Sequence, residues 1–164
     1  VAICLAKAGV QVTATDLSGT AIRNARANAR RNGVDITCRV SDLLGAVDEK
    51  FDLITINPPY NFVRDTFLGN VAKNLLRRIP AIHRSSGTAM PSAVLNFRRE
   101  LMRRFFDQAP ARLLPGGRIL LLAYQCEVEC LKEDLPAGTD VRLLSHPALE
   151  IVRTVGVLIR FPET

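Results

Sequence analysis

The chain has 164 residues, of which 48% are hydrophobic and 23% are charged, a length and composition typical of one globular domain with a single core. Its 22 basic residues outnumber its 16 acidic ones, and the net charge of +6 favours a polyanionic partner such as RNA, DNA or the surface of the ribosome. Because no apolar run reaches the ~18 residues that cross a bilayer, and the first residues lack the pattern of a secretory leader, we expect no membrane partner and a cytoplasmic location.

The first predicted elements are the end of a helix and a strand. Val1 to Ala8 is apolar apart from one lysine and is followed by Gly9, which indicates the last turns of a helix. Val10 to Thr15 alternates as a strand does and ends at Asp16. A carboxylate at that edge can accept both hydroxyls of a ribose. The alternative is a turn residue, with Ser18 as the cap of the next helix.

A second helix and a second strand follow. The spacing of alanine and arginine predicts a helix from Ser18 to Asn32 that stops at Gly33. Val34 to Val40 is the next predicted strand, and a loop follows it up to Lys50. The polar face of the helix carries four arginines, Arg23, Arg26, Arg30 and Arg31.

The run Phe51 to Ile56 is apolar and β-branched and ends abruptly at Asn57-Pro58-Pro59-Tyr60. Proline has no N–H for a ladder, so we predict a buried strand that ends at Asn57. Open α/β folds place ligands at this carboxyl edge. The amide oxygen of Asn57 and the carbonyl of Pro58, which we expect no helix to claim, could both accept from one planar –NH2 group, and Tyr60 could stack on it. The alternative is a plain strand-to-loop turn.

The segment Asn61 to Ala93 has poor periodicity, and we interpret it as a loop that covers a substrate or as a solvated lid. Val94 to Leu114 reads as an amphipathic helix that the turn Pro115-Gly116-Gly117 ends. Its expected solvent face carries Arg98, Arg99, Arg103 and Arg104. The remaining predicted elements are a strand at Arg118 to Tyr124, a helix at Glu127 to Leu135 and strands at Val141 to Ser145 and Ile151 to Phe161.

This order of elements predicts an α/β fold: a Rossmann-like, doubly wound, mostly parallel sheet that ends in an antiparallel hairpin, formed by one domain over residues 1–164. Metal and hydrolase chemistry are not predicted. Cys126 and Cys130 lie four residues apart, but neither a histidine nor a further cysteine stands at the spacing of a zinc site. His83 and His146 lack a partner in a hydrolase motif, and no P-loop is present.

Asn57-Pro58-Pro59-Tyr60 after an apolar strand resembles the signature of class I S-adenosylmethionine-dependent N-methyltransferases of the small-domain type. These enzymes methylate amino groups of RNA and DNA or a release-factor glutamine. The resemblance extends from Asp16 to the Pro115-Gly116-Gly117 turn. It implies that S-adenosylmethionine is the cofactor and that the methyl acceptor is RNA, DNA or a protein such as a release factor. It assigns cofactor binding to Asp16, Leu17, Ser41, Asp42 and Asn57, and the receiving site for the nitrogen to Asn57, Pro58, Pro59 and Tyr60.

In one respect the chain departs from that family. The family has a strand and a glycine-rich loop ahead of the first helix, and we expect this first strand to be missing here. We therefore expect the 164-residue chain to bind the cofactor weakly or not at all. The alternative function is a remnant of the same fold that binds nucleic acid or protein without catalysis.

Overall fold

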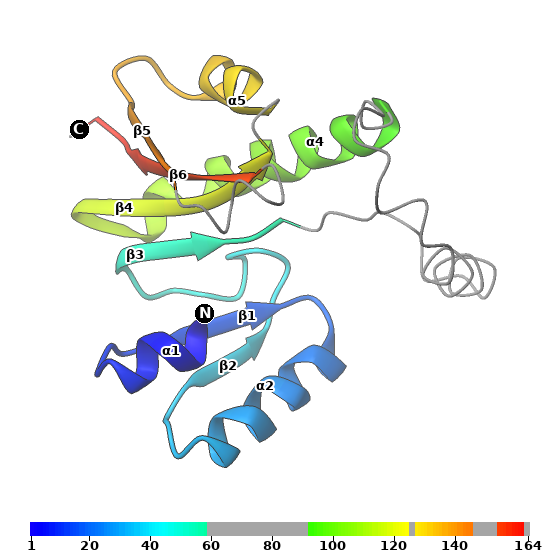
Figure 1. Ribbon diagram of the computed structural model, residues 1–164, viewed down its shortest axis with the longest axis vertical. Helices are drawn as coiled ribbons and strands as arrows, with labels where there is room; N and C mark the ends of the chain where they lie inside the picture. Colours follow the sequence, from blue (N-terminus) through cyan, green and yellow to red (C-terminus); the bar gives the residue numbers. More distant parts are fainter. Residues whose placement is uncertain (59–91, 125–126, 146–153, 163–164) are drawn as a thin grey trace.

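The computed structural model describes residues 1–58, 92–124, 127–145 and 154–162, which contain both helices and strands (Figure 1). The basic segment up to residue 91, with His83, lies outside the described residues, and so does His146. In chain order the elements are α1 (Ala2–Lys7), β1 (Thr13–Asp16), α2 (Gly19–Arg31), β2 (Thr37–Val40), β3 (Phe51–Ile56), α4 (Ser92–Gln108), the 3-10 helix η1 (Pro110–Arg112), β4 (Leu113–Tyr124), α5 (Val128–Asp134), β5 (Asp140–Leu144) and β6 (Thr154–Arg160).

The strands form two sheets. β1 and β2 pair in parallel. The other four strands follow the order β3-β4-β6-β5, in which β3 and β4 are parallel while β6 is antiparallel to both β4 and β5. The predicted antiparallel hairpin at the end of the chain is therefore confirmed, and the architecture is α/β with parallel and antiparallel pairs.

A cleft of about 500 Å³ separates the two sheets. One wall is the segment from Val10 to Thr15, which includes most of β1, and the other includes Phe51 and residues 53–55 of β3. Val1, Ala2 and Leu5 of α1 also line it. In the described part of the chain β1 and β3 share no ladder of hydrogen bonds, although both run toward the same side of the molecule (Figure 1).

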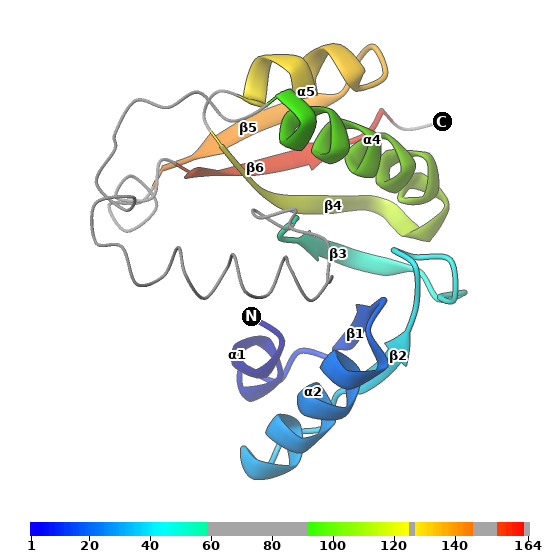
Figure 2. The same cartoon turned by 90° about the vertical axis from the view of Figure 1, so that its right-hand side faces the viewer.

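The core lies between the four-stranded sheet and two helices that cover one of its faces, α4 and α5 (Figure 2). Alternate residues of β4 point into it, so that Ile119 and Leu121 are fully buried. They pair with Ile159 and Val157 of β6. Burial of one such side chain contributes about 1.5–3 kcal/mol. The helices supply Met102, Phe105, Phe106, Val128 and Leu131.

The prediction of a helix up to Leu114 is wrong. α4 ends at Gln108, and Pro110 begins a 3-10 turn, since proline lacks the N–H that an α-helix needs and its ring clashes with the preceding turn. Pro115-Gly116-Gly117 lies inside β4, where the register against β3 shifts between Phe51 and Leu53. The glycines therefore form an irregularity in a strand and do not separate a helix from a strand.

Gly117 has no room for a side chain. A Cβ there would lie 2.8 Å from the carbonyl oxygen of Leu114 and 3.0 Å from that of Phe51, both of them backbone atoms. We predict that Gly117→Ala lowers the free energy of unfolding by about 1–3 kcal/mol, because the strand pairing must shift to admit the methyl group. Urea denaturation measures this.

The matched control is Gly19→Ala, where the nearest atom outside the helix backbone is a flexible Arg23 nitrogen 3.7 Å away. It should be neutral or stabilising, since alanine is the better helix former. Equal loss of stability in the two variants would contradict the close approach at Gly117.

Candidate functional site

Asp16 lies exposed at the carboxyl end of β1 and forms part of a turn. Its Oδ1 accepts a hydrogen bond of 2.7 Å from the backbone N–H of Ser18. The hydroxyl of Ser18 in turn accepts from the N–H of Ala21, so Ser18 is the helix cap, as the alternative interpretation of this segment proposed. Among the described residues no donor contacts the Oδ2 of Asp16. The next side chain, Leu17, is 72% exposed.

Ser41 follows β2 and is 5% exposed. Its N–H donates to the carbonyl of Asp16 at 3.0 Å, and its hydroxyl accepts from the N–H of Ala46 at 2.9 Å. Ser41 thus fixes the end of β2 beside the end of β1. Asp42 is exposed, and its Oδ2 accepts from Arg104 of α4 at 2.5 Å.

Asn57 and Pro58 follow β3, with Asn57 exposed and Pro58 buried. The carbonyl of Pro58 accepts a hydrogen bond of 3.2 Å from Nη1 of Arg98 in α4. The prediction that no helix claims this carbonyl is therefore wrong. A carbonyl oxygen has two lone pairs, so one acceptor position is left. Pro59 and Tyr60 lie outside the described residues.

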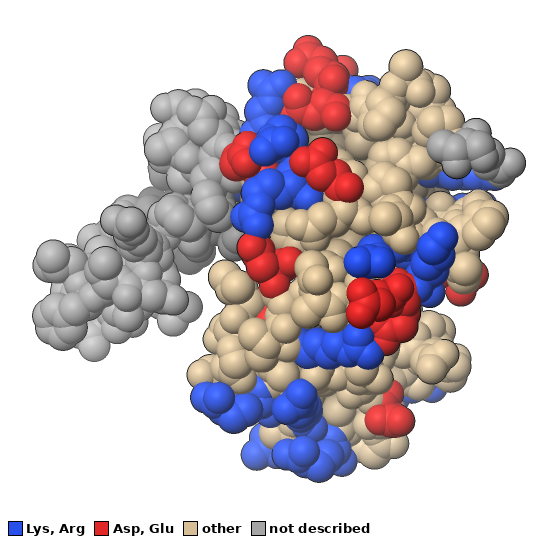
Figure 3. Space-filling view, turned by 180° about the vertical axis from the view of Figure 1, so that it is seen from behind, with Lys and Arg blue, Asp and Glu red and all other residues tan. Residues whose placement is uncertain are grey.

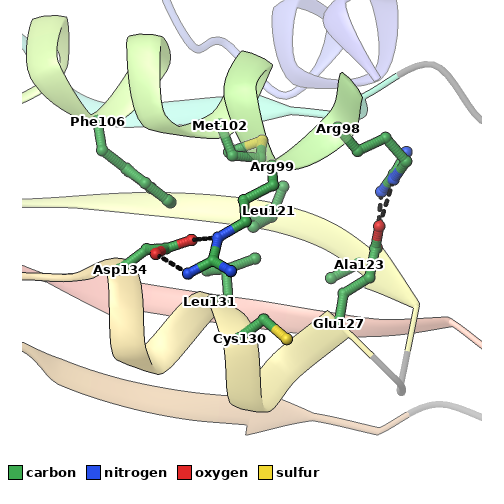
Figure 4. A pocket seen from close by; sticks show the side chains of 10 residues that line it. All are labelled: Arg98, Arg99, Met102, Phe106, Leu121, Ala123, Glu127, Cys130, Leu131 and Asp134. Atoms are coloured by element: carbon green, nitrogen blue, oxygen red, sulfur yellow. Dashed lines mark hydrogen bonds and ion pairs between the residues drawn. The ribbon is translucent and has the colours of Figure 1, made fainter. Parts of the chain in front are cut away.

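Arg98 is the site residue that the sequence interpretation missed. It is 2% exposed and does not lie on a solvent face, which corrects the prediction for this side of α4. Its guanidinium forms an ion pair with Glu127 through two hydrogen bonds, of 2.5 and 2.8 Å (Figure 4). It also lies 5.3 Å from the ring centroid of Tyr124. The helical spacing could have predicted this burial. Arg98 precedes Met102 by four residues and Phe105 by seven, so it lies on the same face of the helix as these two core residues.

The exposed arginines of α4 are also paired with carboxylates. Arg99 donates two hydrogen bonds to the carboxylate of Asp134, and this pairing raises the pKa of Arg99. Arg103 binds Glu100, and this hydrogen bond lowers the pKa of Glu100. Arg103 also pairs with Asp107, and Arg104 pairs with Asp42.

The arginines of α2 differ from those of α4. α2 contains no acidic residue, and its arginines are exposed and form no ion pair with a carboxylate in the described ranges. In Figure 3 basic side chains gather at the lower end of the molecule, where α2 lies, whereas basic and acidic side chains alternate farther up. The positive surface available to a partner therefore includes Arg23, Arg26, Arg30 and Arg31.

A pocket of about 230 Å³ lies between α4 and α5 (Figure 4). Its apolar lining includes Met102, Phe106 and Leu131. Two ion pairs contribute to its walls, namely Arg98 with Glu127 and Arg99 with Asp134.

No group of three or more potential metal ligands occurs in the described part of the chain, and none of its helices combines the length and the apolar character needed to cross a membrane.

These elements define an α/β domain in which Asp16, Asp42 and Asn57 lie at or just after the carboxyl ends of parallel strands. Residues 1–90 match the family described as methyltransferase small domain, and the chain belongs to this family.

The chain is similar in sequence to methyltransferases. The chain is 33% identical over 121 residues to the release factor glutamine methyltransferase of Bordetella pertussis, an alignment that covers 73% of this chain and 41% of that protein. It is 31% identical over 115 residues to the ribosomal RNA small subunit methyltransferase C of Chromohalobacter salexigens, covering 70% and 25%. The matched segment is thus less than half the length of either relative.

Solved structures confirm the Rossmann-like fold. TrmN from Thermus thermophilus superposes with a TM-score of 0.61 at 22% identity, covering 96% of this chain and 39% of TrmN. A ribosomal protein L11 methylase from Lactobacillus delbrueckii gives a TM-score of 0.60 at 19% identity, covering 93% and 58%. A 16S rRNA methyltransferase of T. thermophilus, in complex with AdoMet and guanosine, gives 0.57 at 16% identity, covering 97% and 33%.

We predict that Ser41→Ala destabilises the protein by about 0.5–1.5 kcal/mol, since it removes the hydrogen bond from the N–H of Ala46. Thermal unfolding measures the change. Ser145→Ala, at an exposed serine, is the control and should have no effect. If the two variants unfold at the same temperature, the hydroxyl of Ser41 does not hold the loop after β2.

Proposed function

We propose that the protein encoded by this gene transfers a methyl group from S-adenosylmethionine to a planar amino or amide nitrogen. The observation that carries the proposal is the exposed Asn57, which follows β3 and begins Asn57-Pro58-Pro59-Tyr60 in a chain of the methyltransferase small domain family. β3 itself is mostly exposed or half-buried, with Ile54 its one buried residue, so the prediction of a buried strand is wrong while its end at Asn57 holds. When bound, the cofactor supplies an electrophilic methyl group on a positively charged sulfur.

The residues at the ends of β1 and β2 fit the nucleoside part of that cofactor. The open carboxylate oxygen of Asp16 can accept from ribose hydroxyls, and the exposed Leu17 offers an apolar surface to a base. Asp42 can accept from the adenine amino group while it is paired with Arg104, because a carboxylate has about four lone-pair sites. Ser41 is buried, so its part is to hold these two strand ends together.

The residues at the end of β3 fit the nitrogen. The lone pair of an amide or aromatic amine is delocalised, so such a nitrogen is a poor nucleophile. Its N–H groups would donate to the side chain of Asn57 and to the remaining acceptor position of Pro58, which directs the lone pair out of the plane of the group. The chain therefore contributes position and electrostatics, and no strong base is needed before transfer.

The cleft between β1 and β3 bears on cofactor binding as well. A strand lying in this cleft, at the usual spacing of about 4.8 Å from each neighbour, would pair with both β1 and β3 and unite the two sheets. We infer that a further segment of the protein occupies the cleft and completes the cofactor site, in line with the greater length of the relatives. If the protein has no such segment, the alternative function applies, namely a remnant of this fold that binds nucleic acid or protein without catalysis.

The acceptor is a release-factor glutamine or an RNA base. A release-factor glutamine and ribosomal RNA appear in the names of the relatives. The amide of glutamine and the amino-bearing bases of RNA both present a flat –NH2 group. The arginines of α2 favour a phosphate-rich partner, since no carboxylate in the described part of the chain neutralises them.

Asp16→Ala and Asn57→Ala should separate the two halves of the site in the protein as its gene encodes it. We predict that Asn57→Ala lowers the rate of methyl transfer by ~10²–10³, the loss typical of one positioned hydrogen-bonding group, and leaves cofactor affinity nearly unchanged. Asp16→Ala should chiefly weaken cofactor binding. Methyl incorporation from labelled cofactor and calorimetry measure the two effects.

If Asn57→Ala unfolded the protein, or weakened cofactor binding as much as Asp16→Ala, residues 57–60 would be a structural turn. The assignment of the nitrogen to this site would then fail.

Affinity for single-stranded RNA should depend on the α2 arginines. We predict that Arg30→Gln together with Arg31→Gln makes the slope of log affinity against log salt shallower by about 1.4, because two phosphate contacts are lost. The control is Arg99→Gln with Arg103→Gln, which removes the same charge from exposed arginines that are already ion-paired. An affinity for RNA that does not change with salt concentration, or equal salt slopes in the two double variants, would favour a protein acceptor.

A further inference from the structure

One buried cation stands at the end of the sheet, beside the proposed site for the nitrogen. Arg98 is the only charged residue that is buried in the described part of the chain, and its side chain is 3% exposed. Its partner Glu127 is also largely covered, at 12%. The neighbouring pair of Arg99 and Asp134 is far more open, at 55% and 26%.

Arg98 and Glu127 connect the ends of two strands. Nη1 of Arg98 donates to the carbonyl oxygen of Pro58, which follows β3. Nε and Nη2 of Arg98 donate to the two oxygens of Glu127, at the start of α5. Glu127 also accepts the N–H of Tyr124, the last residue of β4, at 3.0 Å. The carbonyl of Pro58 is thus joined through two side chains to the backbone of the neighbouring strand.

Stability alone does not explain a buried ion pair at this place. The removal of two charges from water costs free energy that their attraction repays only with good geometry. Apolar side chains of similar size are often as stable or more so in such positions. What they could not supply is a charge-assisted hydrogen bond to a particular carbonyl oxygen.

We propose that the ion pair of Arg98 and Glu127 positions the carbonyl of Pro58 to receive the methyl-accepting nitrogen. This inference rests on the function proposed above and makes Arg98 a positioning residue. The hydrogen bond from Arg98 takes one lone pair of the carbonyl oxygen and fixes the direction of the other, which lies near the carbonyl plane. Displacement of a reacting group by about 1 Å can cost 10²-fold in rate, so this orientation matters.

The test uses paired substitutions that leave no charge stranded, in the full-length protein. Arg98→Met with Glu127→Gln removes the guanidinium and keeps an amide oxygen for the N–H of Tyr124. The control is Arg99→Met with Asp134→Asn on the same two helices, an ion pair with no hydrogen bond to Pro58. Both double variants should melt within about 4 °C of the wild type.

We expect only the Arg98 variant to lose activity. Its kcat for methyl transfer should fall by about 10-fold to 100-fold with cofactor affinity unchanged, whereas the control should keep the wild-type kcat. A folded Arg98 variant with wild-type kcat would overturn the proposal. An equal fall of kcat in both variants would also overturn it, because the effect would then come from the packing of α4 on α5.

A second measurement does not need activity. With proline labelled at its carbonyl carbon by ¹³C, and the Pro58 signal assigned through Pro58→Ala, the Pro58 resonance should shift in the Arg98 variant and stay in place in the control. An unchanged resonance would show that Arg98 does not hold this carbonyl. If the wild type transferred no methyl group, the proposed function would fail, while this measurement would still decide whether Arg98 holds Pro58.

Discussion

The parallel pairing of β3 with β4 is the constraint on which the rest of the structure depends. Residues 53 to 56 of β3 pair with residues 118 to 121 of β4, so both strands deliver their carboxyl ends to the same edge of the sheet. β4 also pairs with β6 and carries the buried residues on which α4 and α5 pack. If this pairing slipped by one residue, the buried side chains would turn to the other face. Asn57 and Tyr124 would move with them.

α4 is the element that joins the strand ends. Through Arg104 it contacts Asp42, which follows β2, and through Arg98 it contacts Pro58, which follows β3. The ion pair of Arg98 with Glu127 reaches the last residue of β4 in the same way. A helix whose apolar side builds the core therefore places its polar contacts beside residues proposed for the cofactor and for the nitrogen.

Local sequence patterns were enough to predict most helices and strands, because helix caps, glycines at helix ends and strand alternation each depend on residues close together in the chain. Ser18 as a cap and the strand that ends before Asn57 are of this kind. The Pro115-Gly116-Gly117 segment was misplaced because its conformation depends on β3, more than 50 residues earlier in the chain. The burial of Arg98 was missed for a similar reason, since its partner Glu127 is 29 residues away. Its position on the same helix face as the core residues could still have indicated that Arg98 is buried.

The most direct test of the account is a crystal structure of the full-length protein with S-adenosylhomocysteine, the product form of the cofactor. The account predicts a ribose hydroxyl within hydrogen-bond distance of an Asp16 oxygen, with the sulfur facing the side chain of Asn57 and the Pro58 carbonyl. A nucleoside bound away from Asp16, or a sulfur remote from Asn57, would contradict it.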